Sequence, residues 1–428
     1  MKTNKEFRLD EIAKIDISGV DKKTKEGETP VKLCNFTDVY NNWAVTERLL
    51  PYLMIATANE NEISRFSLKK GMIALTKDSE TRDDIGMSTY IADDLEDTVL
   101  GYHTALIIPD EEKVDGSYLN GYLNSPRARA YFSNQASGSG QRYTLTIDGI
   151  GSVKIALPEL NEQKKIGRLL SAIDRKIELN KEINDNLQHQ LRMLYYYWFV
   201  QCNFPNKDGN PYRNNGGLTY NDSYLKRPVP NDWCVKELSN IGTIVSGGTP
   251  STSNPEYYTE NGIPWITPND LSNNTSNIYI NHGERDITEA GLNNSSATLM
   301  PSGAVLLSTR APIGYIAISE SDVCTNQGFK SVVPDKGYSS AFIYFTLLDM
   351  LPHIYHLGSG TTFKEVSKES ISSMKVIMPP QSIVKQFDEV AIPLLTKCKT
   401  IQEQNRTLSN LRNWLLPMLM NGQATIAD

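Results

Sequence analysis

Few residues in this sequence have the types and spacing that catalysis requires. His353 and His356 are three residues apart and could share one helix face as metal ligands. The other histidines, His103, His189 and His282, form no cluster with them, so surface or half-buried side chains are the simpler interpretation. Pro109–Lys113 (PDEEK) has the letters of a nuclease site, but its carboxylates and lysine are adjacent rather than placed around a metal. We expect an acidic turn there.

Two cofactor-binding patterns are also incomplete. Asn254–Tyr257 (NPEY) superficially resembles the Asn-Pro-Pro-Tyr motif of adenine methyltransferases, but Glu256 replaces a proline and no glycine-rich cofactor loop precedes it. The sequence has no Gly-Lys dipeptide, which a phosphate-binding P-loop needs. The sequence therefore predicts a protein without an active site or a metal site of its own.

Side chains that suit DNA bases are instead gathered in short loops. Amide, guanidinium and hydroxyl groups supply the donor and acceptor pairs that base edges require. In the first half of the chain the candidates are Lys77, Thr81, Arg82, Tyr102, His103, Ser139, Gln141 and Arg142. In the second half they are Ser246, Gly247, Gly248, Thr249, Ser251, Thr309, Arg310, Asn326, Gln327, Ser359, Thr361, Thr362 and Lys364. Any one of these loops alone would be interpreted as a surface turn.

An internal repeat places these loops at matching positions. The segment GSGQRYTLTIDGIGSVKIALPELNEQKKI from Gly138 resembles GSGTTFKEVSKESISSMKVIMPPQSIVKQF from Gly358. The KGMIALT segment from Lys70 matches SGAVLLS from Ser302, and Ile85-Gly86 matches Ile313-Gly314. Matches that keep one order indicate a duplicated unit of about half the chain.

Each repeat joins a β-rich part to a long helix. Ala304–Ser308, Tyr315–Ile318 and Lys330–Val333 are short, β-branched runs that predict strands. Long stretches with few Gly and Pro residues follow Pro158 and Pro379, and we expect helices over 160–200 and 381–420. Apolar residues recur there every seven residues, which favours a coiled coil. The proposed partner-binding positions are Ile166, Leu170, Ile173, Ile177, Leu187, Leu191, Phe387, Leu394, Ile401 and Leu408.

The fold class expected is α+β. Two mixed, mostly β globular modules are joined by two long antiparallel helices that form a coiled coil with an internal pseudo-two-fold repeat. The expected boundaries are 1–157 and 233–379 for the modules, 158–200 and 380–428 for the helices with the C-terminal tail, and 201–232 for an ordered linker.

Four polar or rigid residues interrupt the predicted helices. Asn180 and Asn184 fall on the apolar seam, and Asn405 occupies the place in the second helix that Asn184 has in the first. Buried asparagines would fix the register of the pair, whereas a tilted stripe would leave them solvated, and the sequence does not decide between the two. Pro417 should kink or end the second helix.

Composition sets further limits. The chain has 428 residues, enough for two or three domains, and a formal net charge of -7, which does not favour tight DNA binding by this chain alone. Five scattered cysteines without CxxC spacing indicate neither a disulfide framework nor a zinc ribbon. The N-terminus lacks the apolar core of a signal peptide and no run is long enough to span a membrane, so we expect a cytoplasmic protein.

The order of motifs along the whole chain resembles the specificity subunit of type I restriction-modification enzymes. The resemblance is carried by LPELNEQKKIGRLLSAIDRKIELNKEIN, YWFVQCNFP with GNPYRNNGG, PNDW, SGGTPSTSNPEYY, IPWITPNDL, LLSTRAPIGYIAI, CTNQGFKSV, GSGTTFK and the final long helix. The first module departs from this pattern because it carries Ile17–Val20 where the second has its Gly-Gly-Thr-Pro loop. That departure concerns the contacts to the first half-site.

The resemblance implies a division of labour. Each module would be a target-recognition domain for one half of a split, asymmetric double-stranded DNA sequence, and the helices would fix the gap between the halves. Two methyltransferase subunits carrying S-adenosylmethionine would dock on the helices. Restriction subunits with ATP and Mg would join them, and this chain would hold no cofactor. The alternatives are a stand-alone DNA-modifying enzyme and a scaffold that binds only proteins.

Overall fold

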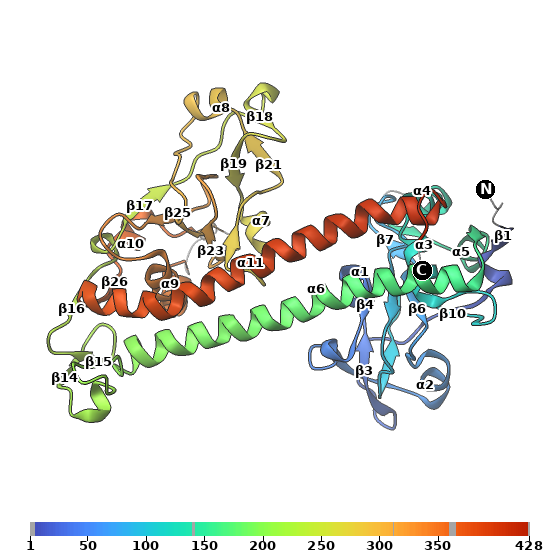
Figure 1. The fold of residues 1–428 in the computed structure, drawn as a ribbon, viewed down its shortest axis with the longest axis horizontal. Helices are drawn as coiled ribbons and strands as arrows, with labels where there is room; N and C mark the ends of the chain where they lie inside the picture. The colour runs from blue at the N-terminus through green and yellow to red at the C-terminus, as the bar shows by residue number, and fades with distance from the viewer. Residues whose placement is uncertain (1–4, 139–141, 311, 359–364, 427–428) are drawn as a thin grey trace. The chain divides into compact units, whose positions relative to one another are not determined.

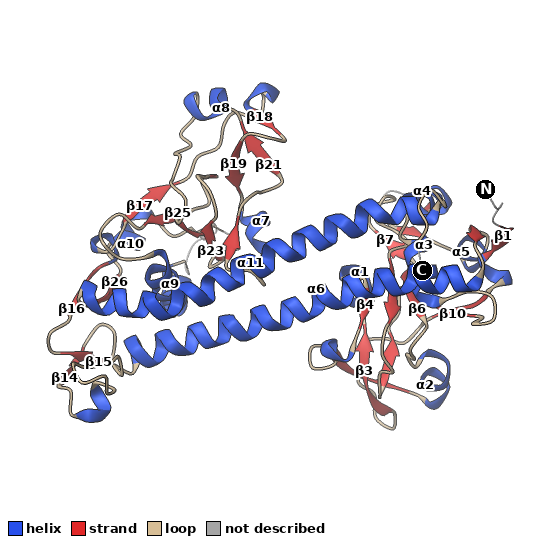
Figure 2. Ribbon diagram, in the orientation of Figure 1, coloured by secondary structure: helices blue, strands red, loops and turns tan. Residues whose placement is uncertain are grey.

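The computed structural model describes residues 5–138, 142–310, 312–358 and 365–426. The chain divides into two compact units, of which the first comprises 1–178 and 406–428 and the second 179–405. Figures 1 and 2 show that each unit combines strands with part of each long helix. Within the described ranges, no helix combines the length and the apolar character that crossing a membrane requires.

The first unit is built on a five-stranded sheet with the order β2-β10-β6-β8-β4. These strands are Ala13–Ile17 (β2), Thr104–Pro109 (β10), Ile73–Thr76 (β6), Ser88–Ile91 (β8) and Ala44–Val45 (β4). Three smaller sheets accompany it among the described residues. β1 (Lys5–Arg8) pairs with β13 (Lys154–Leu157), and β3 (Thr29–Cys34) lies between β5 (Met54–Ala58) and β9 (Thr98–Leu100). In the third, β12 (Tyr143–Thr144) lies between β11 (Ser137–Gly138) and β7 (Asp78–Ser79). The short helices are α1 (Phe36–Asn41), α2 (Glu60–Phe66), α3 (Gly116–Leu123), α4 (Pro126–Gln135) and α5 (Ile147–Gly151).

The second unit repeats this topology. Its five-stranded sheet has the order β17-β25-β22-β23-β20, with bounds Thr243–Ser246, Lys330–Val333, Val305–Leu307, Ile316–Ser319 and Tyr279–Ile280. In both sheets the first three pairings are antiparallel and the last is parallel. The duplication that the sequence predicts is therefore also a duplication of strand order and direction.

The remaining elements of the second unit surround that sheet. A four-stranded sheet has the order β18-β21-β19-β24, with bounds Tyr258–Thr259, Arg285–Ile287, Ile263–Ile266 and Cys324–Thr325. β16 (Cys234–Glu237) pairs with β26 (Lys375–Met378) as β1 pairs with β13. The helices are α7 (Pro268–Ser272), α8 (Glu289–Asn293), α9 (Ser340–Leu357) and α10 (Lys368–Ser372). The expectation of mostly β modules missed α9, an apolar helix of 18 residues.

The two long helices match their predicted positions closely. α6 spans Leu160–Tyr195 and continues as a π-helical turn, Tyr196–Val200. α11 spans Gln381–Met420, so it ends one turn after Pro417. Of the predicted seam residues, Leu187, Leu394 and Leu408 are half-buried and the others are buried.

Both units contain a core in which the two long helices meet. In the first, Ile166 and Leu170 near the start of α6 share a core with Leu416 and Leu419 near the end of α11. In the second, Leu191 and Tyr195 near the end of α6 share a core with Phe387 near the start of α11. Distant segments of the sequence are thus required to complete each core.

A polar layer lies in the helix contact of the second unit. Asn180 and Asn184 are buried, and the Nδ2 of Asn180 donates to the Oδ1 of Asn405 at 2.9 Å. Asn184 donates to the carbonyl oxygen of Ser276 at 3.0 Å. The structure therefore favours the buried alternative for the two α6 asparagines.

The segment 201–232 contains regular secondary structure. β14 (Thr219–Asp222) and β15 (Arg227–Pro230) form a hairpin. Arg227 pairs with Asp349 of α9 at 2.6 Å, and the Phe204 ring stacks on Trp233. The segment is consequently part of the second unit's core rather than a free tether.

Candidate nucleic-acid interface

Three of the predicted DNA-reading residues of the first module converge on one carboxylate. The Nδ1 of His103 lies 2.6 Å from Asp78 Oδ2, Lys77 Nζ lies 3.1 Å from Asp78 Oδ1, and Arg142 Nη2 lies 3.3 Å from Asp78 Oδ2. Together with Thr144 and the β11 strand these residues line a hollow of about 450 Å³. Side chains from three loops thus form one surface.

Asp78 is the anionic centre of this cluster. Burial raises the pKa of its carboxyl group, but hydrogen bonds from Thr144, His103 and Lys77 outweigh burial and lower the pKa below its usual value. The group is therefore ionised at neutral pH and can hold the cations around it. His103 has a φ of 69°, which non-glycine residues rarely adopt, so the surrounding contacts fix its backbone.

Aromatic rings support the other cations of the first module. The Arg82 guanidinium lies 5.1 Å from the centre of the Tyr143 ring, and the Tyr102 and His103 rings are 4.0 Å apart. Thr81 is exposed beside them. The Arg82 guanidinium is therefore held at the surface by its contact with the Tyr143 ring.

Sequence reasoning missed Lys22, whose Nζ lies 5.7 Å from the Tyr102 ring. It belongs to the loop that follows β2, and in the second module the Gly-Gly-Thr-Pro loop follows the corresponding strand β17. The sequence comparison placed Ile17–Val20 opposite that loop, but it did not single out Lys22, because the contact with Tyr102 appears only once distant parts of the chain are brought together.

The Gly-Gly-Thr-Pro loop of the second module packs directly on the Asn326-Gln327 loop. Gly248 N donates to the carbonyl oxygen of Thr325 at 2.9 Å, and the Thr249 hydroxyl donates to Gln327 Oε1. A Cβ atom on Gly247 would overlap the carbonyl oxygen of Asn326, so only glycine permits this approach. Ser246 lies opposite Lys330 in the sheet, and the Ser251 hydroxyl contacts that of Ser253. Predicted residues from two loops thus form one surface.

Arg310 lies next to these loops. Its guanidinium binds Glu365 through Nε at 3.1 Å and Nη2 at 2.9 Å, and its side chain is half exposed. A Cβ on Gly328, next to Gln327, would lie 3.5 Å from the Arg310 Cβ. Both modules therefore present cationic groups on loops at the same end of equivalent strands, and the second module adds the amides of Asn326 and Gln327.

A family model described as "Type I restriction modification DNA specificity domain" matches residues 1–189 and 230–403. The chain belongs to this family. It is 25% identical over 446 residues to the HindI specificity subunit of Haemophilus influenzae, covering 92% of this chain and 94% of that protein. It is 34% identical over 195 residues to the MjaIX specificity subunit of Methanocaldococcus jannaschii, covering 44% and 45% respectively.

A solved structure of the same family has a similar fold. The S subunit of a type I restriction-modification system from M. genitalium aligns over 98% of this chain and 96% of its own, with a TM-score of 0.55 and 15% identity. The α+β class and the duplicated specificity domain are thus confirmed for this chain.

One predicted contact of this specificity-domain protein needs correction. Thr309 is fully buried, and its hydroxyl donates to the carbonyl oxygen of Gly328 at 3.3 Å. Its side chain holds the loop and is not presented to a ligand. Six other predicted residues, Ser139, Gln141, Ser359, Thr361, Thr362 and Lys364, lie outside the described residues.

The segments that resemble metal-binding or nuclease motifs occupy ordinary structural positions. In the described part of the chain, no three His, Cys, Asp or Glu side chains are grouped so that they could hold a metal. His353 contacts the Tyr224 hydroxyl at 2.7 Å. β10 ends at Pro109, and the turn after it is closed by Lys113 and Asp110 at 2.9 Å, as expected for an acidic turn. Membership of a specificity-domain family agrees with the interpretation of the chain as non-catalytic.

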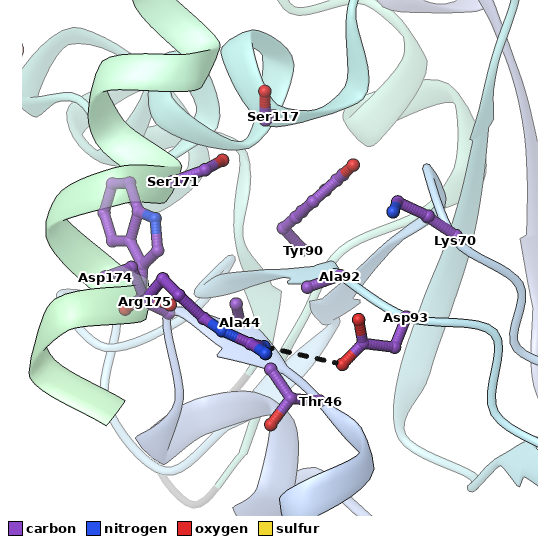
Figure 3. A pocket seen from close by; sticks show the side chains of 11 residues that line it. Ala44, Thr46, Lys70, Tyr90, Ala92, Asp93, Ser117, Ser171, Asp174 and Arg175 are labelled. Atoms are coloured by element: carbon purple, nitrogen blue, oxygen red, sulfur yellow. Dashed lines mark ion pairs between the residues drawn. The ribbon is translucent and has the colours of Figure 1, made fainter. Parts of the chain in front are cut away.

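A second hollow of about 400 Å³ lies where the first module of the specificity subunit meets α6 (Figure 3). Three of its charged lining residues form ion pairs: Arg175 lies 4.0 Å from Asp93, and Asp174 lies 3.6 Å from Arg412, which is outside the lining. The Arg412 guanidinium also stacks over the Trp43 ring at 4.4 Å. These contacts position the module on its helices within the first unit.

Proposed function

We propose that this chain is the DNA sequence-specificity subunit of a type I restriction-modification complex, and that each module reads one half of a bipartite, asymmetric DNA target. The observation that carries the proposal is the recurrence of a polar, cationic loop surface at equivalent strand ends in two copies of one fold. Base edges are read by such groups, whereas phosphate contacts only position a protein on the duplex.

In this proposal the long helices form an antiparallel coiled coil that sets the gap between the half-sites. Their apolar seam and the hydrogen bond from the buried Asn180 to Asn405 support it, because a buried asparagine can fix the register of a helix pair. The proposed domains keep the bounds 1–157, 158–200, 201–232, 233–379 and 380–428. Each recognition module is thereby joined to one spacer helix.

Partners supply what the chain lacks. Two methyltransferase subunits with bound S-adenosylmethionine would dock on the helices, and restriction subunits would supply the ATP- and Mg-dependent steps. The net charge of -7 fits this arrangement, because cationic partner surfaces would contribute to holding the DNA. The chain then contributes sequence discrimination and geometry, but no reacting group.

Methylation mapping tests the proposal. The host genome is sequenced for methylated adenine with and without this gene, and a split motif should disappear when the gene is deleted. If no split motif is lost, the proposed function is wrong. Purified chain incubated with DNA and a labelled methyl donor should transfer no label without partners, and transfer would instead indicate a stand-alone enzyme.

A further inference from the structure

Three charged side chains meet among the loops of the second module. Glu365 places Oε2 against the guanidinium of Arg310 and Oε1 3.4 Å from the Nζ of Lys330. Lys330 is 9% exposed at its side chain, Glu365 33% and Arg310 50%. The cluster therefore runs from a buried cation through one carboxylate to an exposed guanidinium, and cationic charge is in excess.

The carboxylate occupies only one side of that guanidinium. A guanidinium has five N–H donors, and among the described residues Glu365 engages the Nε donor and one on Nη2. The two donors on Nη1 and the second on Nη2 form the opposite end of the fork. That end has the geometry that binds O6 and N7 of guanine in the major groove, the commonest specific arginine contact.

Backbone hydrogen bonds from two neighbouring segments hold Thr309, the residue before Arg310. Thr309 N donates to the carbonyl oxygen of Gly328 at 2.8 Å, and Val366 N donates to the carbonyl oxygen of Thr309 at 2.9 Å. Arg310 and Glu365 face each other across an antiparallel bridge. Because both the backbone and the guanidinium are held, little conformational entropy remains to be lost when the fork meets a base.

The first module has the same backbone arrangement, but its carboxylate lies on the strand that carries the arginine in the second module. Lys77 N donates to the carbonyl oxygen of His103, and Leu145 N donates to that of Lys77, which is the same register as in the second module. Asp78 then corresponds to Arg310, and Thr144 to Glu365. The carboxylate has changed strand, yet it still binds an exposed arginine, Arg142, at 3.3 Å.

We infer that Glu365 is a positioning residue that aims the free end of Arg310 at a guanine in the half-site read by the second module. The inference rests on the proposed function. It adds that one base of the half-site is a guanine and that Arg310 selects it. Glu365 acts through Arg310: its Oε2 accepts from the guanidinium, and its Oε1 lies 3.4 Å from the Nζ of Lys330.

The experiment uses the full chain co-expressed with its methyltransferase partner, and the methylated motif is mapped by sequencing. The wild-type motif should contain a G·C pair at one position that Glu365→Gln relaxes, with preference there falling at least about tenfold, the value of a bidentate contact. The first half-site and the gap should be unchanged, which also reports that the complex is folded. The matched control is Glu237→Gln, which breaks an exposed ion pair to Lys375 at 3.2 Å elsewhere in the unit.

A double-mutant comparison separates aiming from a general structural role. Arg310→Lys should relax the same position, and Glu365→Gln should add nothing in the Arg310→Lys background. Should Glu365→Gln unfold the unit, Glu365→Asp keeps a charge near Lys330 while withdrawing from Arg310, and it should relax the same single position.

The outcomes distinguish failure of the inference about Glu365 from failure of the proposed function. A wild-type split motif that Glu365→Gln leaves intact overturns the inference, as does relaxation at an A·T pair or additive effects of the two substitutions. Absence of any split motif in the wild type overturns the proposed function itself, and the inference with it.

Discussion

At the scale of single residues, the carboxylate of Asp78 links stability of the first module to pH. Its pKa is lowered in the folded protein, so the stabilisation is present above the unfolded value near 4 and is lost as pH falls through the lower folded value. We predict that Asp78→Asn lowers the free energy of unfolding by about 1 to 3 kcal/mol at pH 7. The difference from wild type should shrink below about pH 4.

Urea unfolding of the first unit between about pH 3 and pH 7 measures this effect, because that range brackets the unfolded pKa of an aspartate. Asp148→Asn is the control, since Asp148 is exposed and lies 3.4 Å from Arg8. A difference between Asp78→Asn and wild type that stays constant over the whole range would show that the charge of Asp78 is not the stabilising feature.

Two glycines at equivalent strand ends give a second prediction at this scale. Gly247 follows β17, where a Cβ would overlap the Asn326 carbonyl oxygen, whereas Gly19 follows β2, where an added Cβ would meet no atom within 4 Å. Gly247→Ala should therefore separate the two reading loops and reduce methylation of the target at least about tenfold, since aligned contacts to bases would be lost. Gly19→Ala should leave it unchanged. Methylation rates of the assembled complex measure both, and equal rates for the two variants would contradict the assigned role of the Gly247 contact.

At the scale of elements, the polar layer between α6 and α11 predicts a sign reversal between single and double substitutions. Asn180→Leu alone leaves the Asn405 amide without its partner and should cost about 1 to 3 kcal/mol. Replacing both residues with leucine removes the polar pair and should restore or raise the melting temperature. Thermal unfolding measures both, with the exposed Asn186→Ala as the control. A double variant less stable than Asn180→Leu would exclude this account.

The sequence predicted these elements unequally, for physical reasons. α11 was predicted at its observed bounds because a sustained heptad is a local signal, and Lys330–Val333 coincides with β25. The partner of a strand is not a local property, so the β17-β25-β22-β23-β20 order could not be read from periodicity. The site shows the same limit: Arg310 and Arg142 were identified by residue type, but Asp78 and Glu365 were not, because their importance appears only once distant strands pair. Thr309 was misjudged because strand ends do not reveal which side chain turns inward.

At the scale of the whole molecule, the C-terminal end of the chain completes the core of the N-terminal module. Leu419 is 4% exposed and belongs to the core that contains Ile166 and Leu170, whereas Trp414, in the same helix, is 60% exposed. Leu419→Ala should destabilise the first unit by about 2 to 5 kcal/mol, whereas Trp414→Ala should stay within about 0.5 kcal/mol of wild type. Thermal unfolding with hydrogen exchange, which locates the change, distinguishes them. Loss of protection in the second unit alone would contradict this role of Leu419.

The spacer proposal makes the largest-scale prediction. The border between the two units falls after Glu178 in α6 and after Asn405 in α11, so one heptad inserted at both places leaves the contacts within each unit intact. Seven residues add about 10 Å of helix. They fall only about 20° short of two full turns, so the apolar face beyond the insertion keeps nearly the same direction. The tolerated gap in the methylated motif should lengthen by up to about three base pairs at 3.4 Å each, with both half-sites unchanged. An insertion in α6 alone is the control, because it lengthens one helix without the other and should abolish methylation. A motif with an unchanged gap after the double insertion would mean that the helices do not set the distance between the half-sites.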